Sequence, residues 1–240
     1  MRFAEVVARL AVLPEELPEP PRELNPVLLG PVGVQSSPAC YPLDPAAAAR
    51  SDRDAADPPS IPSDTRLPWP PGPRRRAAAL VLVYPGTDGE AFVILIRRPQ
   101  DDSRHAGEVA LPAGEIEPDD ASPTAAALRE AAEEVGLDPV QAGLHVLGEL
   151  GVVEIRASGF ELTPVLALAS REPVLRANPC EVAALHRVPL RHFLAGAPIQ
   201  TVEEERRAGR LRYGAYPADG LRVWGATARV LGQLGAILGG

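Results

Sequence analysis

The chain has 240 residues and a formal net charge of -8, and all 24 of its strongly basic residues are arginine. Its length fits one large domain or one domain with an appendage, and 45% hydrophobic residues suffice for a core, which excludes wholesale disorder. No apolar run reaches the roughly 20 residues that span a bilayer, no leader is recognised, and the acidic balance disfavours nucleic acid. We therefore expect a cytoplasmic protein without membrane or nucleic-acid partners.

The first third of the chain differs in composition from the rest. Sixteen of the 28 prolines lie in residues 1–73. Residues 2–12 place their apolar side chains at helical spacing, which predicts a short amphipathic helix. Residues 36–73 hold too many prolines to supply the backbone donors of a helix or sheet, which predicts an extended arm. We therefore expect an N-terminal helix plus Pro-rich extension over 1–75 and a globular domain over 76–240.

The globular part predicts strands that interleave with helices. Residues 77–84 and 91–97 are apolar runs joined by the turn sequence PGTDGE, so we expect a hairpin. Further elements are predicted as strands at 144–153, 160–168 and 182–189, a short helix at 190–195 and an amphipathic helix at 224–238. Because strands and helices alternate, the predicted fold class is α/β or α+β.

The clearest element is a helix within residues 122–137, SPTAAALREAAEEVGL. Ser122 can cap its first turn, Pro123 suits the first helical position, and Gly136 can end it in a left-handed turn. These signals predict both ends of the helix.

This helix carries a cluster of carboxylates. Glu130, Glu133 and Glu134 are spaced three or four residues apart, so we expect them on one face, where like charges repel. Glu133 and Glu134 also lie near the C-terminal end, where the helix dipole disfavours anions. A bound Mg²⁺ or Mn²⁺ would remove both objections, because such cations prefer carboxylate oxygens. The alternative is a solvated acidic face offset by Arg129, four residues before Glu133.

The loop before the helix strengthens the case for a site. Residues 111–120, LPAGEIEPDD, contain two prolines, four acidic residues and Gly114. Gly114 would permit a close backbone approach or a positive φ angle.

These residues resemble a known family. The segment 114–137 is similar to the Nudix box, G-x5-E-x7-R-E-U-x-E-E-x-G-U, where U is aliphatic. Its second half matches through Arg129, Glu130, Glu133 and Glu134, together with the glycine and leucine that follow. In the first half, Asp120 stands in place of a glutamate, and Arg129 comes one residue later than the pattern has it.

The extra residue is also typical of the coenzyme A diphosphatase branch of Nudix hydrolases. The upstream segment 94–114 is similar to the signature L-L-T-x-R-[SA]-x3-R-x3-G-x3-F-P-G-G of that branch, with Arg98, Gly107 and Pro112 in register. It departs from the signature at three positions. These hold Ser103 for an arginine with Arg104 beside it, Leu111 for phenylalanine, and Ala113 for the first glycine.

The resemblance implies an α/β/α sandwich with a mixed sheet and hydrolysis of a nucleoside diphosphate linked to another moiety, X. It implies Mg²⁺ or Mn²⁺ as cofactor and Glu130, Glu133 and Glu134 as the metal ligands. Arg129 is expected to hold a glutamate through a charge-assisted hydrogen bond. Gly114 is expected to shape the loop and contact substrate or metal, and Asp120 to support these residues from behind.

The resemblance leaves the general base open. Glu133 is one candidate and Glu181 of the segment NPCEV is the other, ahead of Glu149 and Glu154. For substrate contacts we expect Arg98, whose planar guanidinium suits phosphate, followed by Arg104 and His105 on the same loop.

Three readings of function follow. The first is a diphosphatase acting on coenzyme A or its acyl esters, as a monomer or possible homodimer. The second is the same enzyme with another X, such as ADP-ribose, an NDP-sugar or a dinucleoside polyphosphate, which the changes at Ser103, Leu111 and Ala113 keep open. The third is a non-catalytic, nucleotide-sensing or scaffolding domain, against which the intact glutamates argue.

Overall fold

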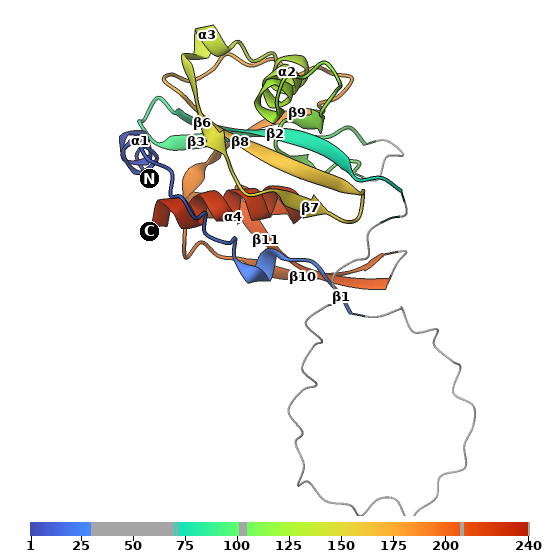
Figure 1. Cartoon of the computed structure of the whole chain (residues 1–240). Coiled ribbons are helices and arrows are strands. Elements are labelled where there is room, and N and C mark those ends of the chain that lie inside the picture. The colour runs from blue at the N-terminus through green and yellow to red at the C-terminus, as the bar shows by residue number, and fades with distance from the viewer. Residues whose placement is uncertain (30–69, 71, 101–104, 207–208, 240) are drawn as a thin grey trace, which may run out of the picture.

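A computed structural model describes residues 1–29, 70, 72–100, 105–206 and 209–239. The predicted Pro-rich arm falls almost entirely outside these described residues (Figure 1). No helix among the described residues is long and apolar enough to cross a membrane.

A mixed β-sheet forms the centre of the domain. The predicted hairpin is confirmed: β2 (Arg75–Pro85) and β3 (Ala91–Arg97) pair antiparallel next to their turn. β2 also runs parallel to β8 (Phe160–Ala169) along most of its length. Within the described residues the sheet has the order β4-β3-β2-β8-β6, with three further strands attached. The remaining strands of this sheet are β4 (Val109–Ala110), β5 (Ala113–Glu115), β6 (Leu144–Glu149), β7 (Val153–Ile155) and β9 (Ala184–Pro189).

The helix α2 (Pro123–Val135) has both predicted ends. The backbone N–H of Ala125 donates to Ser122 Oγ at 3.1 Å, and Pro123 occupies the first turn. Gly136 follows with φ 62°, a left-handed conformation in which glycine is favoured. Local sequence chemistry alone therefore fixes where α2 begins and ends.

Replacing Ser122 with alanine leaves the Ala125 N–H without its side-chain acceptor. We expect the variant to lose about 1 kcal/mol of unfolding free energy, measured by urea denaturation. Ser122→Asp, which keeps an acceptor, should restore most of the loss. Equal destabilisation by both variants would contradict the capping role.

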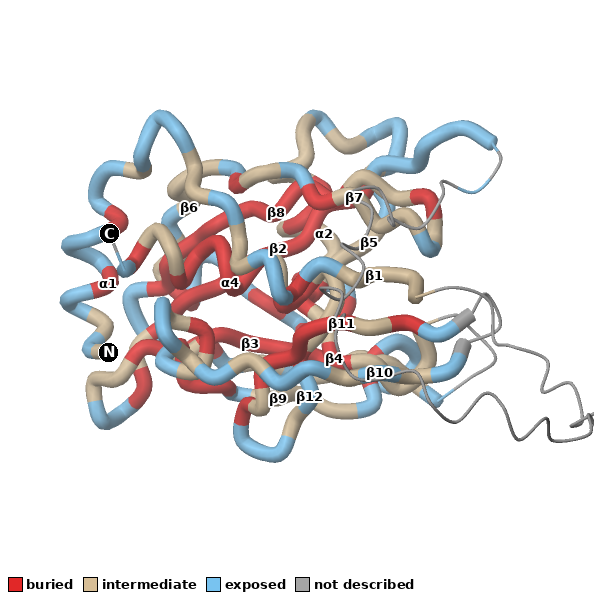
Figure 2. Tube along the Cα trace, turned by 90° about the horizontal axis from the view of Figure 1, so that it is seen from below, coloured by how far each residue is buried: buried red, intermediate tan, exposed pale blue. Residues whose placement is uncertain are grey.

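Two helices cover the two faces of the mixed sheet (Figure 1). α2 packs on the face formed by Leu80, Leu82, Ile94 and other alternate residues. The opposite face, with Val81, Val83 and Leu95, packs against α4 (Gly225–Gly239). Buried segments therefore run through the sheet and α4, as Figure 2 shows. This arrangement confirms the predicted α/β/α fold with a mixed sheet.

A second, antiparallel sheet lies beyond α4 (Figure 1). Within the described residues it has the order β1-β11-β10, and β12 pairs with β11. Tyr216, Ala218 and Val223 join it to the core around α4. Neither β1 nor the strands between residues 200 and 224 were predicted from the sequence. Their bounds are β1 (Val27–Leu28), β10 (Gln200–Arg206), β11 (Gly209–Ala218) and β12 (Leu221–Trp224).

The N-terminal segment packs into the same core. The predicted first helix is present as α1 (Phe3–Arg9), which ends earlier than residue 12. Val6 and Leu10 are buried in the cluster that contains α4, as is Leu24 in the short 3-10 helix η1 (Arg22–Leu24). Residues before the Pro-rich arm thus contribute apolar surface to the domain core.

Several predicted boundaries shift. The strand predicted at 144–153 is two strands, β6 and β7, because the chain turns at Leu150, whose N–H donates to the carbonyl of Pro164 at 2.8 Å. Trp224 ends β12 instead of starting α4, and its ring packs 4.5 Å from that of Tyr213. The short helix predicted at 190–195 is a 3-10 turn, η3 (Leu190–Phe193), and an unpredicted short helix, α3 (Pro139–Ala142), follows α2.

Candidate active site

The three glutamates of α2 lie in different environments. Glu134 is only 3% exposed, and its carboxylate accepts the backbone N–H of Ala113 at 2.9 Å. The Glu130 side chain is largely buried, whereas that of Glu133 is 52% exposed. Glu130 and Glu134 are four residues apart and face inward toward the β5 loop. The expectation of one shared face therefore fits Glu130 and Glu134, with Glu133 turned outward.

Gly114 is required by the close approach of Glu130. A Cβ atom at position 114 would lie 2.0 Å from Glu130 Oε1 and 2.1 Å from its carboxyl carbon. The φ angle of Gly114 is not positive, so conformational freedom is not the reason for glycine here. Of the two roles expected for Gly114, the structure shows the close approach.

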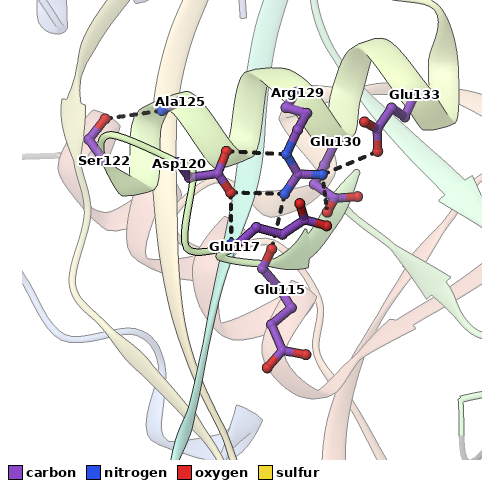
Figure 3. A network of polar contacts seen from close by, with 8 residues as sticks. All are labelled: Glu115, Glu117, Asp120, Ser122, Ala125, Arg129, Glu130 and Glu133. Atoms are coloured by element: carbon purple, nitrogen blue, oxygen red, sulfur yellow. Dashed lines mark hydrogen bonds and ion pairs between the residues drawn. The ribbon is translucent and has the colours of Figure 1, made fainter.

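Arg129 connects the helix to the preceding loop (Figure 3). Its Nε and Nη2 donate to the two carboxylate oxygens of Asp120 at 3.1 and 2.9 Å, and Nη2 also donates to the carbonyl of Glu115 at 3.1 Å. Its Nη1 donates to Glu130 at 2.8 Å and to Glu133 at 3.2 Å. Such bidentate, charge-assisted bonds fix geometry as well as charge. Arg129 therefore orients Glu130 while Asp120 orients Arg129.

Asp120 is itself held by the loop. Its Oδ2 accepts the backbone N–H of Glu117 at 2.8 Å (Figure 3). The bond from Arg129, followed by that from Glu117, lowers the pKa of Asp120, so this carboxylate is ionised at neutral pH. Aspartate is long enough to reach Arg129 from this position, which is where the Nudix box has glutamate.

Burial makes ionisation of the two inward-facing carboxylates, Glu130 and Glu134, unfavourable. Burial raises the pKa of Glu134 to about 7, against the Ala113 hydrogen bond and the charge of Arg98, and the charges of Glu130 and Glu181 raise it further. Burial also raises the pKa of Glu130, against the bond from Arg129. A bound cation would favour the ionised form of both carboxylates, as any nearby positive charge does.

Glu181 reaches this cluster through a loop fastened to the end of α2. The backbone N–H of Asn178 donates to the carbonyl of Glu134 at 2.8 Å, and Glu181 N–H donates to Asn178 at 3.0 Å. Ala183 N–H donates to the carbonyl of Arg97 at 2.8 Å, which secures the other side of the loop. The neighbouring Cys180 is exposed and is a free cysteine in the described part of the chain.

The donor set fits a hard divalent cation. Glu130, Glu134 and Glu181 are close enough for their charges to interact, and Gly114 leaves the space beside Glu130 that a side chain would fill. In the described part of the chain, however, no three carboxylate, imidazole or thiol groups converge as a preformed cation site. Instead, the carboxylates of Glu130 and Glu133 both accept hydrogen bonds from Arg129.

The residues predicted to contact substrate lie in different surroundings. Arg98 lies near Glu134, whose pKa its charge lowers, and Arg98 Nε is buried without a hydrogen-bond partner among the described residues. His105 Nδ1 contacts Glu108 Oε2 at 3.0 Å on its own loop. Arg104 and Ser103 lie outside the described residues.

The two less favoured candidates for the base lie on strands of the sheet. Glu149 ends β6, and Glu154 on β7 forms an ion pair with Arg156 at 2.7 Å. Neither acts on the pKa of Glu130 or Glu134, whereas Glu181 acts on both.

An apolar cavity of about 260 Å³ lies on the α4 side of the molecule. Its lining includes Pro21, Phe193, Ile199, Tyr216 and Gly232, and none of the predicted site residues. The carboxylate site on α2 is therefore separate from this cavity.

Backbone groups are the part of the site that sequence reasoning missed. The N–H of Ala113 and the carbonyl of Glu115 hold Glu134 and Arg129, and neither contact depends on side-chain identity. The short strand β5, which pairs Ala113 with Ala79 and Glu115 with Ala77, positions both groups. In the sequence, only the prolines and the glycine of the loop indicated that its backbone approaches the helix.

Comparisons with known proteins agree with the geometry. A family model, the NUDIX domain, matches residues 73–207. The chain is 34% identical over 160 residues to the uncharacterized Nudix hydrolase NudL of Yersinia pestis (strain Pestoides F), covering 67% of this chain and 78% of that protein.

The chain is also similar to solved structures of Nudix proteins. A Nudix hydrolase from M. smegmatis, RenU, is 30% identical with a TM-score of 0.42, over 50% of this chain and 74% of RenU. The NUDIX domain of Shewanella oneidensis NrtR complexed with ADP ribose is 22% identical with a TM-score of 0.39, over 51% and 79% of the two chains.

Proposed function

Because the chain belongs to the Nudix hydrolase family, we propose that it hydrolyses the diphosphate of coenzyme A or its acyl esters, giving 3′,5′-ADP and 4′-phosphopantetheine or its acyl form. Family membership establishes the coarser activity, divalent-metal-dependent hydrolysis of a nucleoside diphosphate linked to X. The observation that carries the proposal is the structural role of the residues at positions 111 and 113.

Two departures from the coenzyme A signature preserve its physical roles. Leu111 is 3% exposed and packs in the core, as an apolar phenylalanine would. Ala113 contributes its backbone N–H to Glu134, a contact that glycine makes equally well. At both positions, the residue present can therefore fill the structural role of the residue in the signature.

We assign Glu130, Glu133 and Glu134 as the ligands of Mg²⁺ or Mn²⁺. When bound, the cation neutralises the diphosphate and favours attack by water on phosphorus. Glu133 is exposed and paired with Arg129, so it would have to give up this contact to join the other two carboxylates around a cation. The bonds of Arg129 to Asp120 and to the Glu115 carbonyl do not involve Glu133 and would keep the loop in place.

For the general base, Glu181 gains support over Glu133. Its charge raises the pKa of both Glu130 and Glu134, and it comes from a different element than the box helix, which supports this choice. Glu133 stays a candidate as a residue of the box itself. Arg98, with its unpartnered Nε, is the proposed contact to the diphosphate.

The rival within the same enzyme class changes only X, to ADP-ribose, an NDP-sugar or a dinucleoside polyphosphate. What favours it is Ser103, which stands where the signature has an arginine. The non-catalytic alternative is opposed by buried Glu134 and Glu130, whose burial is costly in a domain that only binds.

Phosphorus NMR of the products tests the proposal. With Mg²⁺ or Mn²⁺ we expect coenzyme A to give 3′,5′-ADP and 4′-phosphopantetheine, well ahead of ADP-ribose and a dinucleoside polyphosphate. Excess EDTA should abolish turnover. Turnover of ADP-ribose alone would keep the hydrolase and overturn coenzyme A as substrate, and turnover of no substrate would favour the binding-domain reading.

A further inference from the structure

The end of β3 directs two consecutive arginines to opposite faces of the sheet. Side chains alternate along β3, with Ile94 and Ile96 in the core under α2 and Val93 and Leu95 in the core around α4. Arg97, the last residue of β3, continues the α4-facing set. Arg98 acts on Glu134 and therefore lies on the α2 side.

His186 of β9 lies on the same face as Arg97. In the antiparallel register, His186 is opposite Leu95, and Ala184 is opposite Arg97. Arg97 and His186 are therefore diagonal neighbours, at a separation of roughly 7–8 Å that a long side chain bridges. The charge of Arg97 also lowers the pKa of His186, after the larger effect of burial, so the imidazole is neutral at pH 7.

This pair has unused hydrogen-bonding capacity. Among the described residues, His186 Nε2 is buried without a hydrogen-bond partner, which is unfavourable unless a bound group satisfies it. Arg97 donates from Nη1 to the carbonyl of Gly107 at 3.3 Å, a contact that leaves further donors of its guanidinium for a ligand. Both residues are partly exposed, and the residue opposite Arg97 is the small Ala184.

From this placement we propose that Arg97 and His186 bind the 3′-phosphate of the adenosine ribose of the substrate. The inference rests on the proposed coenzyme A substrate. With the diphosphate held at Arg98 and the α2 glutamates, the ribose would pass over the end of β3, and its 3′-phosphate would meet the next arginine on the other face. Among the substrates considered, the 3′-phosphate separates coenzyme A from ADP-ribose, so this pair would set specificity.

Binding of the nucleotide product tests this without turnover. Calorimetry with the full chain in Mg²⁺ compares 3′,5′-ADP with 5′-AMP, which lacks the 3′-phosphate. We expect wild type to bind 3′,5′-ADP at least about tenfold more tightly. Arg97→Gln and His186→Gln should each remove most of this preference and change 5′-AMP binding by less than about twofold.

Arg187→Gln provides the matched control. Arg187 is the neighbour of His186 in β9, but it lies on the other face, stacked 4.8 Å from the ring of Phe92 and paired with Glu172. Its substitution should leave the affinity ratio unchanged.

The outcomes separate the inference from the proposed function. Equal weakening of both nucleotides by Arg97→Gln, or no preference in wild type, would overturn the 3′-phosphate assignment even if coenzyme A is hydrolysed. A preference that depends on Arg97 in a protein that does not cleave coenzyme A would uphold the inference and overturn the proposed activity.

Discussion

Replacing Glu134 with glutamine should lower kcat by about 10³-fold, the equivalent of about 4 kcal/mol in the transition state. Glutamine preserves the size of the side chain and can still accept the Ala113 N–H, so the change removes charge and little else. Steady-state kinetics with coenzyme A at saturating Mg²⁺ measures the effect. Glu130→Gln should cause a loss of the same order, because that carboxylate shares the site.

Stability should move the other way in the metal-free protein. The pKa of Glu134 is raised from 4.5 to about 7 in the folded state, so this group makes folding less favourable as pH rises through that interval and stays unfavourable above it. Metal-free Glu134→Gln should therefore unfold at the same or a higher temperature than wild type at pH 7.5. Adding Mg²⁺ should raise the unfolding temperature of wild type and leave that of the variant unchanged.

Two further variants test the assignment. Glu5→Gln, on the exposed surface of α1, should alter neither activity nor the response to Mg²⁺. Glu133→Gln should reduce turnover while nucleotide binding persists. If Glu133→Gln retains full activity, Glu133 is not a ligand or base, and its contact with Arg129 is only a surface ion pair.

The sequence could not distinguish these three glutamates. Helical spacing places Glu130 and Glu134 on the same side, but it does not say which side of α2 faces the β5 loop. Burial of Glu134 depends on strand β5 and on the loop that carries Glu181, both brought to α2 by pairings distant in sequence. The local signals, in contrast, were sufficient for the ends of α2 at Ser122 and Gly136.

The second sheet contains strands that hydrophobic patterning does not predict. β10 contains three consecutive glutamates and little apolar alternation, so it lacks the usual features of a strand. Its pairing with β11 is accompanied by opposite charges: Glu203 lies opposite Arg212 and bonds it at 2.8 Å. Such cross-strand pairs stabilise a sheet, but the partners can be identified only once the register is known.

Gly114→Ala should reduce activity strongly and stability only slightly. The new Cβ would overlap the carboxylate of Glu130, the far end of a flexible side chain, which can swing aside. The variant should therefore lose less than about 1 kcal/mol of unfolding free energy. Glu130, however, would leave its position beside Arg129 and Glu134. Because displacement of a catalytic group by about 1 Å can cost about 10²-fold in rate, we expect at least that loss in kcat, measured alongside urea denaturation.

Gly235→Ala gives the opposite pattern and serves as the comparison. A Cβ there would lie 1.9 Å from the backbone carbonyl oxygen of Phe193, which cannot rotate away, so α4 must shift against the core. We expect a large loss of stability from that variant, and near-normal kcat in the fraction that stays folded, because α4 is on the face opposite α2. Full activity of Gly114→Ala would show that Glu130 works from another rotamer, and the geometry assigned to the carboxylate site would then be wrong.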